Sequence, residues 1–384
     1  MSSEIFRAFF MIYIHIPFCR QKCSYCNFHF STSLNFKDEM ISAMKTEIRL
    51  RKDELQNKNL KSLYFGGGTP SILSADEISS MIDEVLKYFS FDRDIEVTLE
   101  ANPDDLDKNF LQQLAKSPVN RLSIGTQSFF DEDLRLMNRA HNASEAEGSI
   151  KRAQDFGFEN LSIDLIYGSP TSNLEIWKEN LNKTIALEVP HISSYALTVE
   201  PKTALENWIA KGKIASPREE EQNREFYYLS DFLKDNGFEH YEVSNFAKPG
   251  FYSRHNSSYW KYKEYLGIGP SAHSYNGFDV RSWNVANNQQ YIKKLDGGFL
   301  AKEEEILSQN DQFNEMIMIG LRTIWGVDIE SLNSKFSEQT LEHFRREIQS
   351  KIEEGILITE NNHLKIPEKH WFMADGIASD LFIV

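Results

Sequence analysis

The sequence predicts an α/β fold, in which a partial barrel of parallel strands is followed by a small, mainly helical domain. Short β-like runs alternate six times with longer amphipathic segments, the pattern of parallel strands joined by right-handed helical crossovers. Polar, glycine-rich or cysteine-rich motifs recur where these strands end. Beyond residue 300 the pattern changes to helix, helix and hairpin. Six units fall short of the eight of a closed barrel, so we expect an open, three-quarter TIM-type barrel.

The six units follow from β-branched and aromatic runs and from helical periodicity. A Ser-Ala-Asp-Glu capping sequence begins the helix at residue 74. We expect strands at 12–16, 61–65, 95–100, 121–124, 161–166 and 191–197, and helices at 36–55, 74–89, 106–115, 131–137, 144–156, 174–187 and 218–236.

The sequence after the predicted barrel differs from it in composition. Residues 237–283 hold 12 aromatic side chains, about twice the chain-wide share of 12%. A charged stretch, Ala-Lys-Glu-Glu-Glu, then reads as a link. Expected helices at 312–323 and 340–354 and short strands at 355–359 and 363–366 give a winged-helix-like ending. The predicted division is an N-terminal extension (1–11), the barrel (12–236), an aromatic-rich extension and linker (237–300) and a C-terminal domain (301–384).

Composition narrows the function classes. With 42 Lys and Arg against 57 Asp and Glu, the net charge of -15 argues against nucleic-acid binding as the main activity. No apolar run reaches the ~20 residues needed to span a bilayer, and residues 1–11 lack the features of a secretory signal. Unpaired thiols indicate a reducing compartment. We therefore expect a cytoplasmic protein.

The three cysteines of the chain are Cys19, Cys23 and Cys26, spaced C-x3-C-x2-C. An odd number of thiols so close together cannot form a disulfide framework, which leaves a metal site. Zinc would need a fourth ligand, for which His15 or His29 is available. An iron–sulfur cubane held by three cysteines would instead keep one iron without a protein ligand.

Other motifs lie where strands end, and the loops there build the active site of such barrels. A Gly-Gly-Gly-Thr run at 66–69 permits close backbone approach to a ligand, although a turn also explains it. A carboxylate at Glu100 suits a sugar diol, and Arg139 suits a carboxylate, although both residue types are common on surfaces. Gln127 and Asp164 are polar residues at the ends of apolar strands, where a polar side chain needs a partner or a function. Tyr195 lies at the end of the sixth strand.

The cysteine spacing, with Tyr25 before the last cysteine, resembles that of the radical SAM superfamily. The resemblance implies a 4Fe-4S cluster on Cys19, Cys23 and Cys26, with S-adenosylmethionine chelated at the open iron. It also implies an electron donor for the cluster. Cleavage of S-adenosylmethionine would then give a 5'-deoxyadenosyl radical, with the protein orienting the cofactor.

Longer motifs narrow the resemblance to the oxygen-independent coproporphyrinogen III oxidase family. They run in order along the chain: Tyr-Ile-His-Ile-Pro-Phe-Cys at 13–19, Tyr-Phe-Gly-Gly-Gly-Thr-Pro at 64–70, Glu-Ala-Asn-Pro at 100–103, Gly-Thr-Gln-Ser-Phe at 125–129, Asn-Arg-Ala-His at 138–141 and Asp-Leu-Ile-Tyr-Gly at 164–168. By position, the resemblance implies S-adenosylmethionine contacts from Tyr13, Gly67, Gly68, Thr69, Glu100, Gln127, Arg139 and Asp164, and packing beside the cluster by Tyr25 and Phe28.

Two departures point to the haem chaperone subgroup of that family. Oxidases of the family carry a fourth cysteine two residues after the third, where this chain has Phe28. They also carry a long N-terminal arm, whereas about a dozen residues precede the first strand here. The resemblance thus implies haem delivery to acceptor haemoproteins, including those of a respiratory chain reached by peripheral membrane contact. Phe28 also puts the oxidase's second cofactor site in doubt.

Haem binding needs an iron ligand, and the cysteines are already assigned to the cluster. Histidine is the natural alternative, and the aromatic-rich region holds His240, His255 and His273. The Arg-His-Asn-Ser-Ser-Tyr-Trp sequence resembles a motif of the chaperone subgroup, so we select His255, with a structural role in the core as the alternative. Two other functions compete with haem delivery. The first is coproporphyrinogen III oxidation, and the second is a radical SAM methyltransferase or haem-degrading activity.

Overall fold

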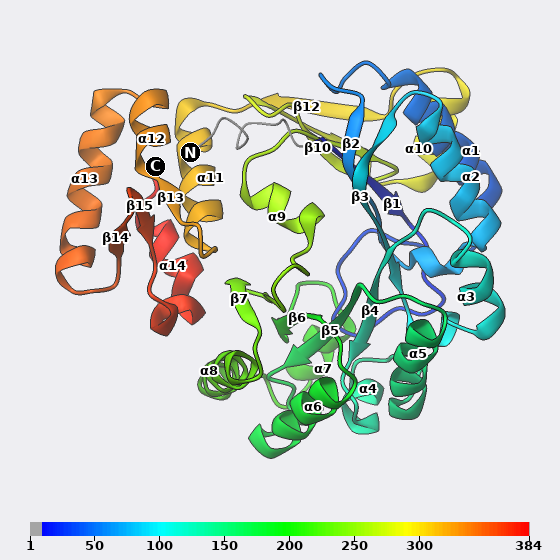
Figure 1. Cartoon of the computed structure of the whole chain (residues 1–384), viewed down its shortest axis with the longest axis horizontal. Helices are drawn as coiled ribbons and strands as arrows, with labels where there is room; N and C mark the ends of the chain where they lie inside the picture. Colours follow the sequence, from blue (N-terminus) through cyan, green and yellow to red (C-terminus); the bar gives the residue numbers. More distant parts are fainter. Residues whose placement is uncertain (1–9, 384) are drawn as a thin grey trace.

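The structure is a computed structural model that describes residues 10–383, and six parallel strands in sequence order form its centre (Figure 1). Helices connect successive strands along the outer side of the curved sheet. The open six-stranded partial barrel is confirmed. Its strands are β1 (Met11–Ile16), β2 (Asn59–Gly67), β3 (Ser90–Ala101), β4 (Arg121–Gln127), β5 (Leu161–Tyr167) and β6 (His191–Ala196), and its helices are α1 (Lys37–Leu50), α2 (Ala75–Leu86), α3 (Lys108–Leu114), α4 (Asp131–Leu136), α5 (Ala143–Asp155) and α6 (Leu174–Ala186).

The sheet continues beyond both ends of the barrel. On the β1 side, β9 (Tyr265–Ile268) pairs in parallel, and β10 (His273–Tyr275), β11 (Val280–Asn284) and β12 (Lys302–Ile306) follow antiparallel. The expected charged link is wrong, because residues 302–306 are an edge strand paired with β11. Its charged side chains are largely exposed, as is usual where an edge must resist further pairing. On the β6 side lie β8 (Asn245–Ala247) and β7 (Glu239–Glu242).

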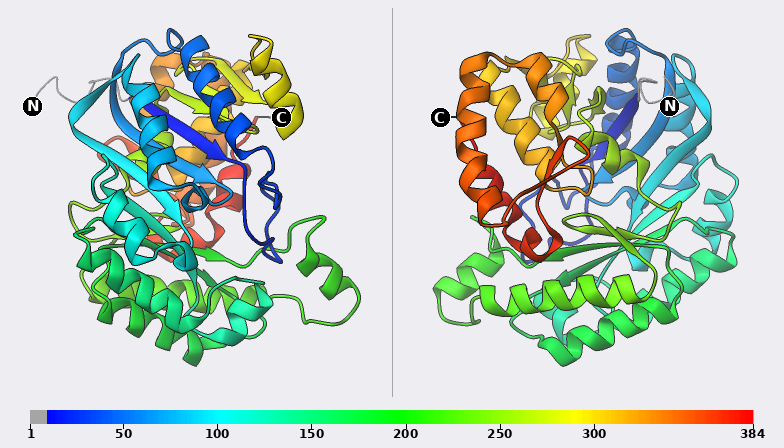
Figure 2. Two further views of the ribbon diagram at one scale, coloured as in Figure 1. Left: turned by 90° about the vertical axis from the view of Figure 1, so that its right-hand side faces the viewer. Right: turned by 60° about the vertical axis from the view of Figure 1, so that its left-hand side comes forward.

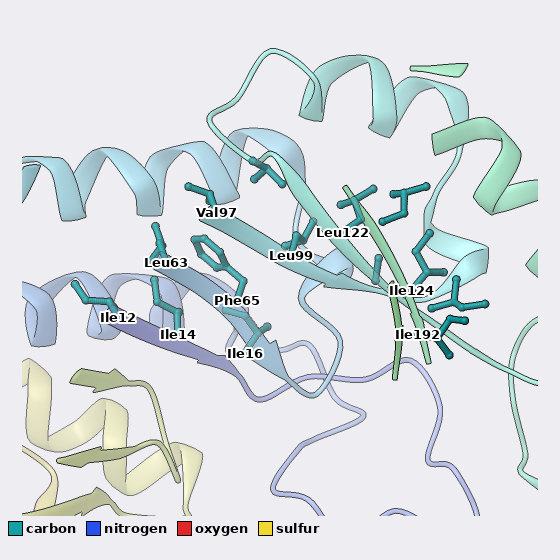
Figure 3. Close-up of a cluster of buried hydrophobic side chains, with 14 of the residues drawn as sticks. Ile12, Ile14, Ile16, Leu63, Phe65, Val97, Leu99, Leu122, Ile124 and Ile192 are labelled. Carbon is teal, nitrogen blue, oxygen red and sulfur yellow. The ribbon is translucent and has the colours of Figure 1, made fainter. Parts of the chain in front are cut away.

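The parallel strands divide their side chains between two different environments. Successive residues point to opposite faces of a sheet. Apolar residues point to the outer face, where they form the core under the helices; Figure 3 shows Ile14, Phe65, Leu99 and Ile124 among them. The alternate positions on the inner face are largely polar or aromatic: Tyr13, His15, Ser62, Tyr64, Thr98, Glu100, Ser123, Ser162, Asp164, His191, Ser193 and Tyr195.

The C-terminal part is a helical unit, as expected, and its sheet has three strands where the expected hairpin has two (Figure 2). It packs on α8 (Glu219–Asp235), where Glu368 accepts hydrogen bonds from Ser230 Oγ and Lys234 Nζ, both at 2.8 Å. Its elements are α11 (Gln309–Leu321), β13 (Val327–Asp328), α12 (Ile329–Lys335), α13 (Glu338–Glu353), β14 (Ile358–Glu360), β15 (His363–Lys365), η3 (Glu368–Met373) and α14 (Ala374–Ser379).

The remaining elements connect these parts of the molecule. The predicted N-terminal extension falls mostly on residues 1–9, which lie outside the described part of the chain. Between residues 10 and 383, none of the helices has the length and apolar character of a membrane span.

Some short helices were not among those that sequence periodicity predicts. They are α7 (Ala204–Ala210), α9 (Arg254–Trp260), α10 (Asn288–Asp296), η1 (Pro70–Ile72) and η2 (Pro103–Asp105).

A buried ion pair on α1 fixes the position of the added strands. Arg51 and Glu47 are each 1% exposed and lie 2.9 Å apart. Arg51 also donates to the Gly267 carbonyl at 2.7 Å, and Glu47 accepts from Asn284 Nδ2 at 2.7 Å. The carboxylate further accepts from the Gly269 N–H and the Tyr291 hydroxyl. One pair of charges therefore joins α1 to β9, β11 and α10.

We expect Arg51→Ala to destabilise the protein by about 3 to 5 kcal/mol, because it leaves the Glu47 carboxylate buried without its cation. Urea unfolding measures this loss. The control is Arg345→Ala, since Arg345 pairs with Glu338 on the surface and such pairs contribute about 0 to 1 kcal/mol. Equal losses of stability in the two variants would contradict the expectation that the buried pair contributes more to stability than the surface pair.

Candidate functional site

The cysteines lie on the loop between β1 and α1, and backbone contacts hold this loop over the strand ends. The Cys19 N–H donates to the Ser31 carbonyl at 3.0 Å, which closes the base of the loop. Ser24, between the second and third thiols, donates its N–H to the Met137 carbonyl and its hydroxyl to the Leu136 carbonyl. The loop is thus attached to the end of α4, some hundred residues along the chain.

Two of the thiols already contact residues from other parts of the chain, one after β2 and one after α4. Thr69 Oγ1 lies 3.5 Å from Cys19 Sγ, and Arg139 Nη1 lies 3.3 Å from Cys23 Sγ. Burial raises the pKa of the Cys19 thiol to about 11, partly offset by the Thr69 hydrogen bond. The thiol is therefore protonated at neutral pH in the absence of a metal. Iron binding would displace the proton, as it does for thiolate ligands in general.

The zinc alternative depends on His15 or His29, and both rings have other partners. His15 Nδ1 lies 3.2 Å from the Tyr13 hydroxyl, and its Nε2 lies 3.0 Å from the His29 carbonyl. His29 Nε2 is 2.7 Å from Asn288 Oδ1. Within residues 10–383 no three His, Cys, Asp or Glu side chains converge on a single-ion site. A cubane does not require convergence, because each thiolate binds a different iron atom.

Arg139 joins three parts of the site. Besides Cys23, its guanidinium donates from Nη2 to Asn102 Oδ1 at 2.7 Å and to the Gly125 carbonyl at 2.8 Å. Its Nε is buried and has no hydrogen-bond partner. A buried donor without a partner is costly, so this atom is suited to a ligand that brings an acceptor.

Two carboxyl groups, Glu100 on β3 and Asp164 on β5, line the cavity from the inner face of the sheet. Burial raises the pKa of Glu100 to about 7, and the charge of Asp164 adds to the shift. Burial likewise raises the pKa of Asp164 to about 6. Glu100 accepts from the Tyr64 hydroxyl at 2.8 Å and from the Gly67 N–H at 3.2 Å. Both groups are therefore partly protonated near neutrality, and a cationic or hydroxyl-bearing ligand would favour their ionised forms.

Backbone geometry shapes the floor between the cysteines and these carboxyl groups. Gly67 has φ +108°, a conformation that side chains rarely adopt. A Cβ on Gly68 would lie 2.5 Å from the Phe18 carbonyl oxygen, so only glycine fits there. Gln127 also has a positive φ, at 66°, and follows a register shift in the pairing of β4 with β5. Such irregularities redirect side chains next to binding sites.

These residues enclose one cavity of about 520 Å³. That volume suits a small-molecule cofactor. The structure brings to its lining the expected metal ligands Cys19, Cys23 and Cys26 and, of the expected cofactor contacts, Tyr25, Phe28, Gly67, Gly68, Thr69, Glu100, Gln127, Arg139 and Asp164.

Two expected contacts do not line the cavity. Tyr13 lies on the inner face behind Gly66, with its hydroxyl bonded to His15. His255 is 1% exposed on α9, where Nδ1 meets Ser62 Oγ at 2.8 Å and Nε2 meets the Tyr259 hydroxyl at 3.0 Å. Both ring nitrogens are thus engaged inside the barrel, and the role of His255 as an iron ligand stays a prediction.

The structure also adds residues that sequence reasoning did not assign. Asn102 lines the cavity and connects Arg139 to Thr69, to whose Oγ1 it donates at 3.4 Å. As a polar residue just past a strand end, it could have been found by the rule that selected Gln127. Glu200 accepts from Asn27 Nδ2 at 2.8 Å at the rim of the cavity. No motif marks Glu200.

Comparisons with known proteins agree with this geometry. A model of the radical SAM superfamily matches residues 13–183, and a model of the HemN C-terminal domain matches residues 307–373. The solved structure of coproporphyrinogen III oxidase (HemN) from Escherichia coli, a radical SAM enzyme, aligns with a TM-score of 0.83 at 23% identity, over 98% of this chain and 90% of that chain. The fold and the cysteine loop are those of a radical SAM protein.

Curated relatives match nearly the whole chain. Heme chaperone HemW of Lactococcus lactis subsp. lactis is 33% identical over 365 residues, 95% of each chain. Heme chaperone HemW of Bacillus subtilis is 33% identical over 348 residues, 90% of this chain and 92% of the relative. Radical S-adenosyl methionine domain-containing protein 1, mitochondrial, of Mus musculus is 32% identical over 370 residues, 92% and 83%. This chain belongs to the haem chaperone subgroup of the oxygen-independent coproporphyrinogen III oxidase family.

We expect Asp164→Asn to stabilise the protein at pH 8, by on the order of 1 kcal/mol, and to have little effect near pH 4. Because the pKa of Asp164 is raised in the fold, its protonated form is favoured there. Its contribution to stability is therefore present below the unfolded pKa of about 4 and is lost as the pH rises through about 6. Urea unfolding across this range measures the difference.

The control for this prediction is Asp235→Asn, because Asp235 is exposed at the end of α8. Its substitution should change the free energy of unfolding by only a small amount. Suppose that Asp164→Asn is less stable than the unsubstituted protein at pH 8 and that the two are equally stable at pH 4. That result would contradict the burial of this charge.

Proposed function

We propose that this protein is a haem chaperone that holds a 4Fe-4S cluster, S-adenosylmethionine and haem, and that passes haem to acceptor haemoproteins. The names of the relatives support the proposal, since those of Lactococcus lactis and Bacillus subtilis are both heme chaperones. The working partners would be haem, the acceptor proteins and an electron donor for the cluster. We place this activity in the cytoplasm, with peripheral contact to membranes that carry acceptors.

The observation that carries the proposal is the side chain at position 28. Phe28 lines the cavity two residues past Cys26, and it is 68% exposed. The oxidases that the sequence resembles have a cysteine at this point. A large, exposed apolar side chain beside the cluster loop can pack against a flat apolar ligand, but it supplies no polar group to hold a second cofactor.

The cluster would be held by the three thiols, which come from one loop and lie at one cavity. When bound, the cluster supplies one electron to the sulfonium of S-adenosylmethionine. Arg139 contributes positive charge beside Cys23, and Thr69 donates toward Cys19. Hydrogen bonds to cluster sulfur are one of the means by which proteins tune such centres.

The remaining lining residues suit S-adenosylmethionine. Glu100 is placed for hydroxyl donors, as in a ribose diol, and ionisation of its carboxyl group would accompany binding. The unpaired Arg139 Nε is available to a carboxylate. Gly67 and Gly68 keep the backbone open to close approach. Gln127 and Asp164 complete the polar wall that these groups form.

We expect Cys19→Ala, Cys23→Ala and Cys26→Ala each to abolish the brown absorbance of the reconstituted cluster while leaving a folded protein. None of the three thiols belongs to the core under the helices, so the fold does not depend on them. Iron and sulfide analysis and far-UV circular dichroism measure the two effects. Phe28→Ala is the control and should retain the cluster. Unchanged iron and sulfide in the cysteine variants would refute the assignment.

Chaperone and oxidase are separated by two measurements on the full chain. Ferric haem added to the reconstituted protein should give a saturable Soret band. Incubation with coproporphyrinogen III, S-adenosylmethionine and a reductant should leave the substrate unchanged. Absence of haem binding would overturn the proposal, and formation of protoporphyrinogen would favour the oxidase.

A further inference from the structure

A second, smaller cavity lies inside the barrel and borders the cysteine cavity, which is the cavity of about 520 Å³ that the three cysteines line. This inner cavity has a volume of about 50 Å³. A polar space of that size holds a few water molecules, since each needs about 10 to 15 Å³. Every residue of its lining carries a polar group: Tyr64, Glu100, Arg121, Ser123, Ser162, Asp164, Ser193, Tyr195, Ser253 and Asn256.

Arg121 brings a buried positive charge to the inner cavity. The residue begins β4 and is 2% exposed. Its Nη1 donates to Asn160 Oδ1 at 2.6 Å. Among residues 10–383 no carboxylate forms an ion pair with this guanidinium. A buried charge is costly unless it is compensated, so Arg121 needs a counter-charge at longer range.

Three buried carboxyl groups on the inner face are candidates for that counter-charge. Both oxygens of Glu96 accept backbone hydrogen bonds, from Arg254 at 3.1 Å and from His255 at 3.0 Å. Glu100 likewise accepts at both oxygens, as described above. Asp164 accepts from Ser123 Oγ at 3.2 Å through one oxygen. Asp164 also lines the inner cavity, so water there can connect its carboxyl group to Arg121.

The titratable and charged groups around Asp164 leave two cations to act on it. Burial raises the pKa of the Tyr64 and Tyr195 phenols, so both stay neutral. Burial also raises the pKa of Asp164 to about 6, and the charges of Arg139 and Arg121 oppose that rise. The side of α9 adds the uncharged Ser253 and Asn256. The groups that surround Asp164 are Tyr64, Glu100, Arg121, Arg139 and Tyr195.

The two guanidinium groups approach Asp164 from different cavities. Arg139 lines the cysteine cavity and is bonded there to the cluster loop. Arg121 lines only the inner cavity. The charge of Arg121 opposes the raised pKa of Asp164, whereas the pKa of Glu100 depends on burial, on Asp164 and on its own hydrogen bonds. Arg121 therefore acts on one of the two carboxyl groups of the site.

We propose that Arg121 is a positioning residue for the cofactor: through water in the inner cavity, it keeps the negative charge of Asp164 on the wall of the cysteine cavity. The inference rests on the proposed function, which supplies S-adenosylmethionine as the ligand. That cofactor carries a sulfonium, an ammonium and two ribose hydroxyl groups, all of which interact better with a carboxylate than with a neutral acid. Arg121 does not line the cysteine cavity, so it assists binding without touching the cofactor.

The first test uses the full-length protein without cluster or cofactor. The stability gained by Asp164→Asn should grow with pH and level off as the pH passes the Asp164 pKa of about 6. With Arg121→Gln or Arg121→Met in the background, the levelling-off should move up by about one pH unit, because the cation that favours the carboxylate is gone. Urea unfolding between pH 4 and pH 9 measures the shift.

Two further variants separate charge from structure. Arg121→Lys keeps a positive charge and should leave the levelling-off close to its original pH. Asn160→Ala removes the hydrogen-bond partner of Arg121 but not its charge, and should also leave that pH unchanged. Arg121→Met keeps most of the side-chain volume, so the test does not depend on the folding of Arg121→Gln alone.

The second test measures the affinity of the reconstituted protein for S-adenosylmethionine by equilibrium dialysis. At pH 6, Arg121→Gln should weaken binding by about fivefold, because a one-unit shift takes Asp164 from about one half to about one tenth ionised. At pH 8.5 the two proteins should bind alike. A purely structural role of Arg121 would instead weaken binding equally at both pH values.

The outcomes separate this inference from the proposed function. An unchanged levelling-off pH in the Arg121→Gln and Arg121→Met backgrounds would overturn the role of Arg121 and leave the chaperone function standing. A loss of affinity that is equal at pH 6 and pH 8.5 would do the same. Failure of the unsubstituted, reconstituted protein to bind S-adenosylmethionine would overturn both this role and the cofactor assignment of the proposed function.

Discussion

The site depends on the position of one guanidinium. Arg139 donates to Cys23 Sγ, Asn102 Oδ1 and the Gly125 carbonyl, so a single side chain joins the cysteine loop to the ends of β3 and β4. A charge removed from bulk water requires nearly all of its donors to be paired, which fixes the guanidinium in one place. The Nε atom, which has no hydrogen-bond partner within residues 10–383, then becomes a feature of the cavity rather than a defect of the fold.

The arrangement of polar residues follows from strand geometry. Alternate residues of each parallel strand face the helices and form the apolar core, which stabilises the sheet. The opposite positions are then free to carry polar groups, and they do so on one strand after another. Glu100, Asp164 and Tyr195 are brought together in this way from three strands. Burial on the inner face raises the pKa values of both carboxyl groups, and the charge of Asp164 adds to the shift at Glu100.

The limits of sequence reasoning lie at particular residues. The charged residues 301–305 predict a link, although an edge strand needs only its backbone to pair. Tyr13 and His255 belong to motifs that the family resemblance highlighted, yet their rings pack within the barrel. Histidine type and motif were visible in the sequence, whereas exposure of the ring was not.

The sequence by itself determined the six-unit partial barrel and the cysteine loop, and it placed the motif residues at one edge of the sheet, because strand and helix periodicity and parallel topology bring all strand ends to that edge. The spacing of residues along the chain is enough to predict these features. Only the tertiary structure decided which of the expected side chains, such as Tyr13, do not line the cavity, and how β9 to β12 extend the sheet. These depend on contacts between residues far apart in the chain, such as Arg51 with Gly267, which no local pattern records.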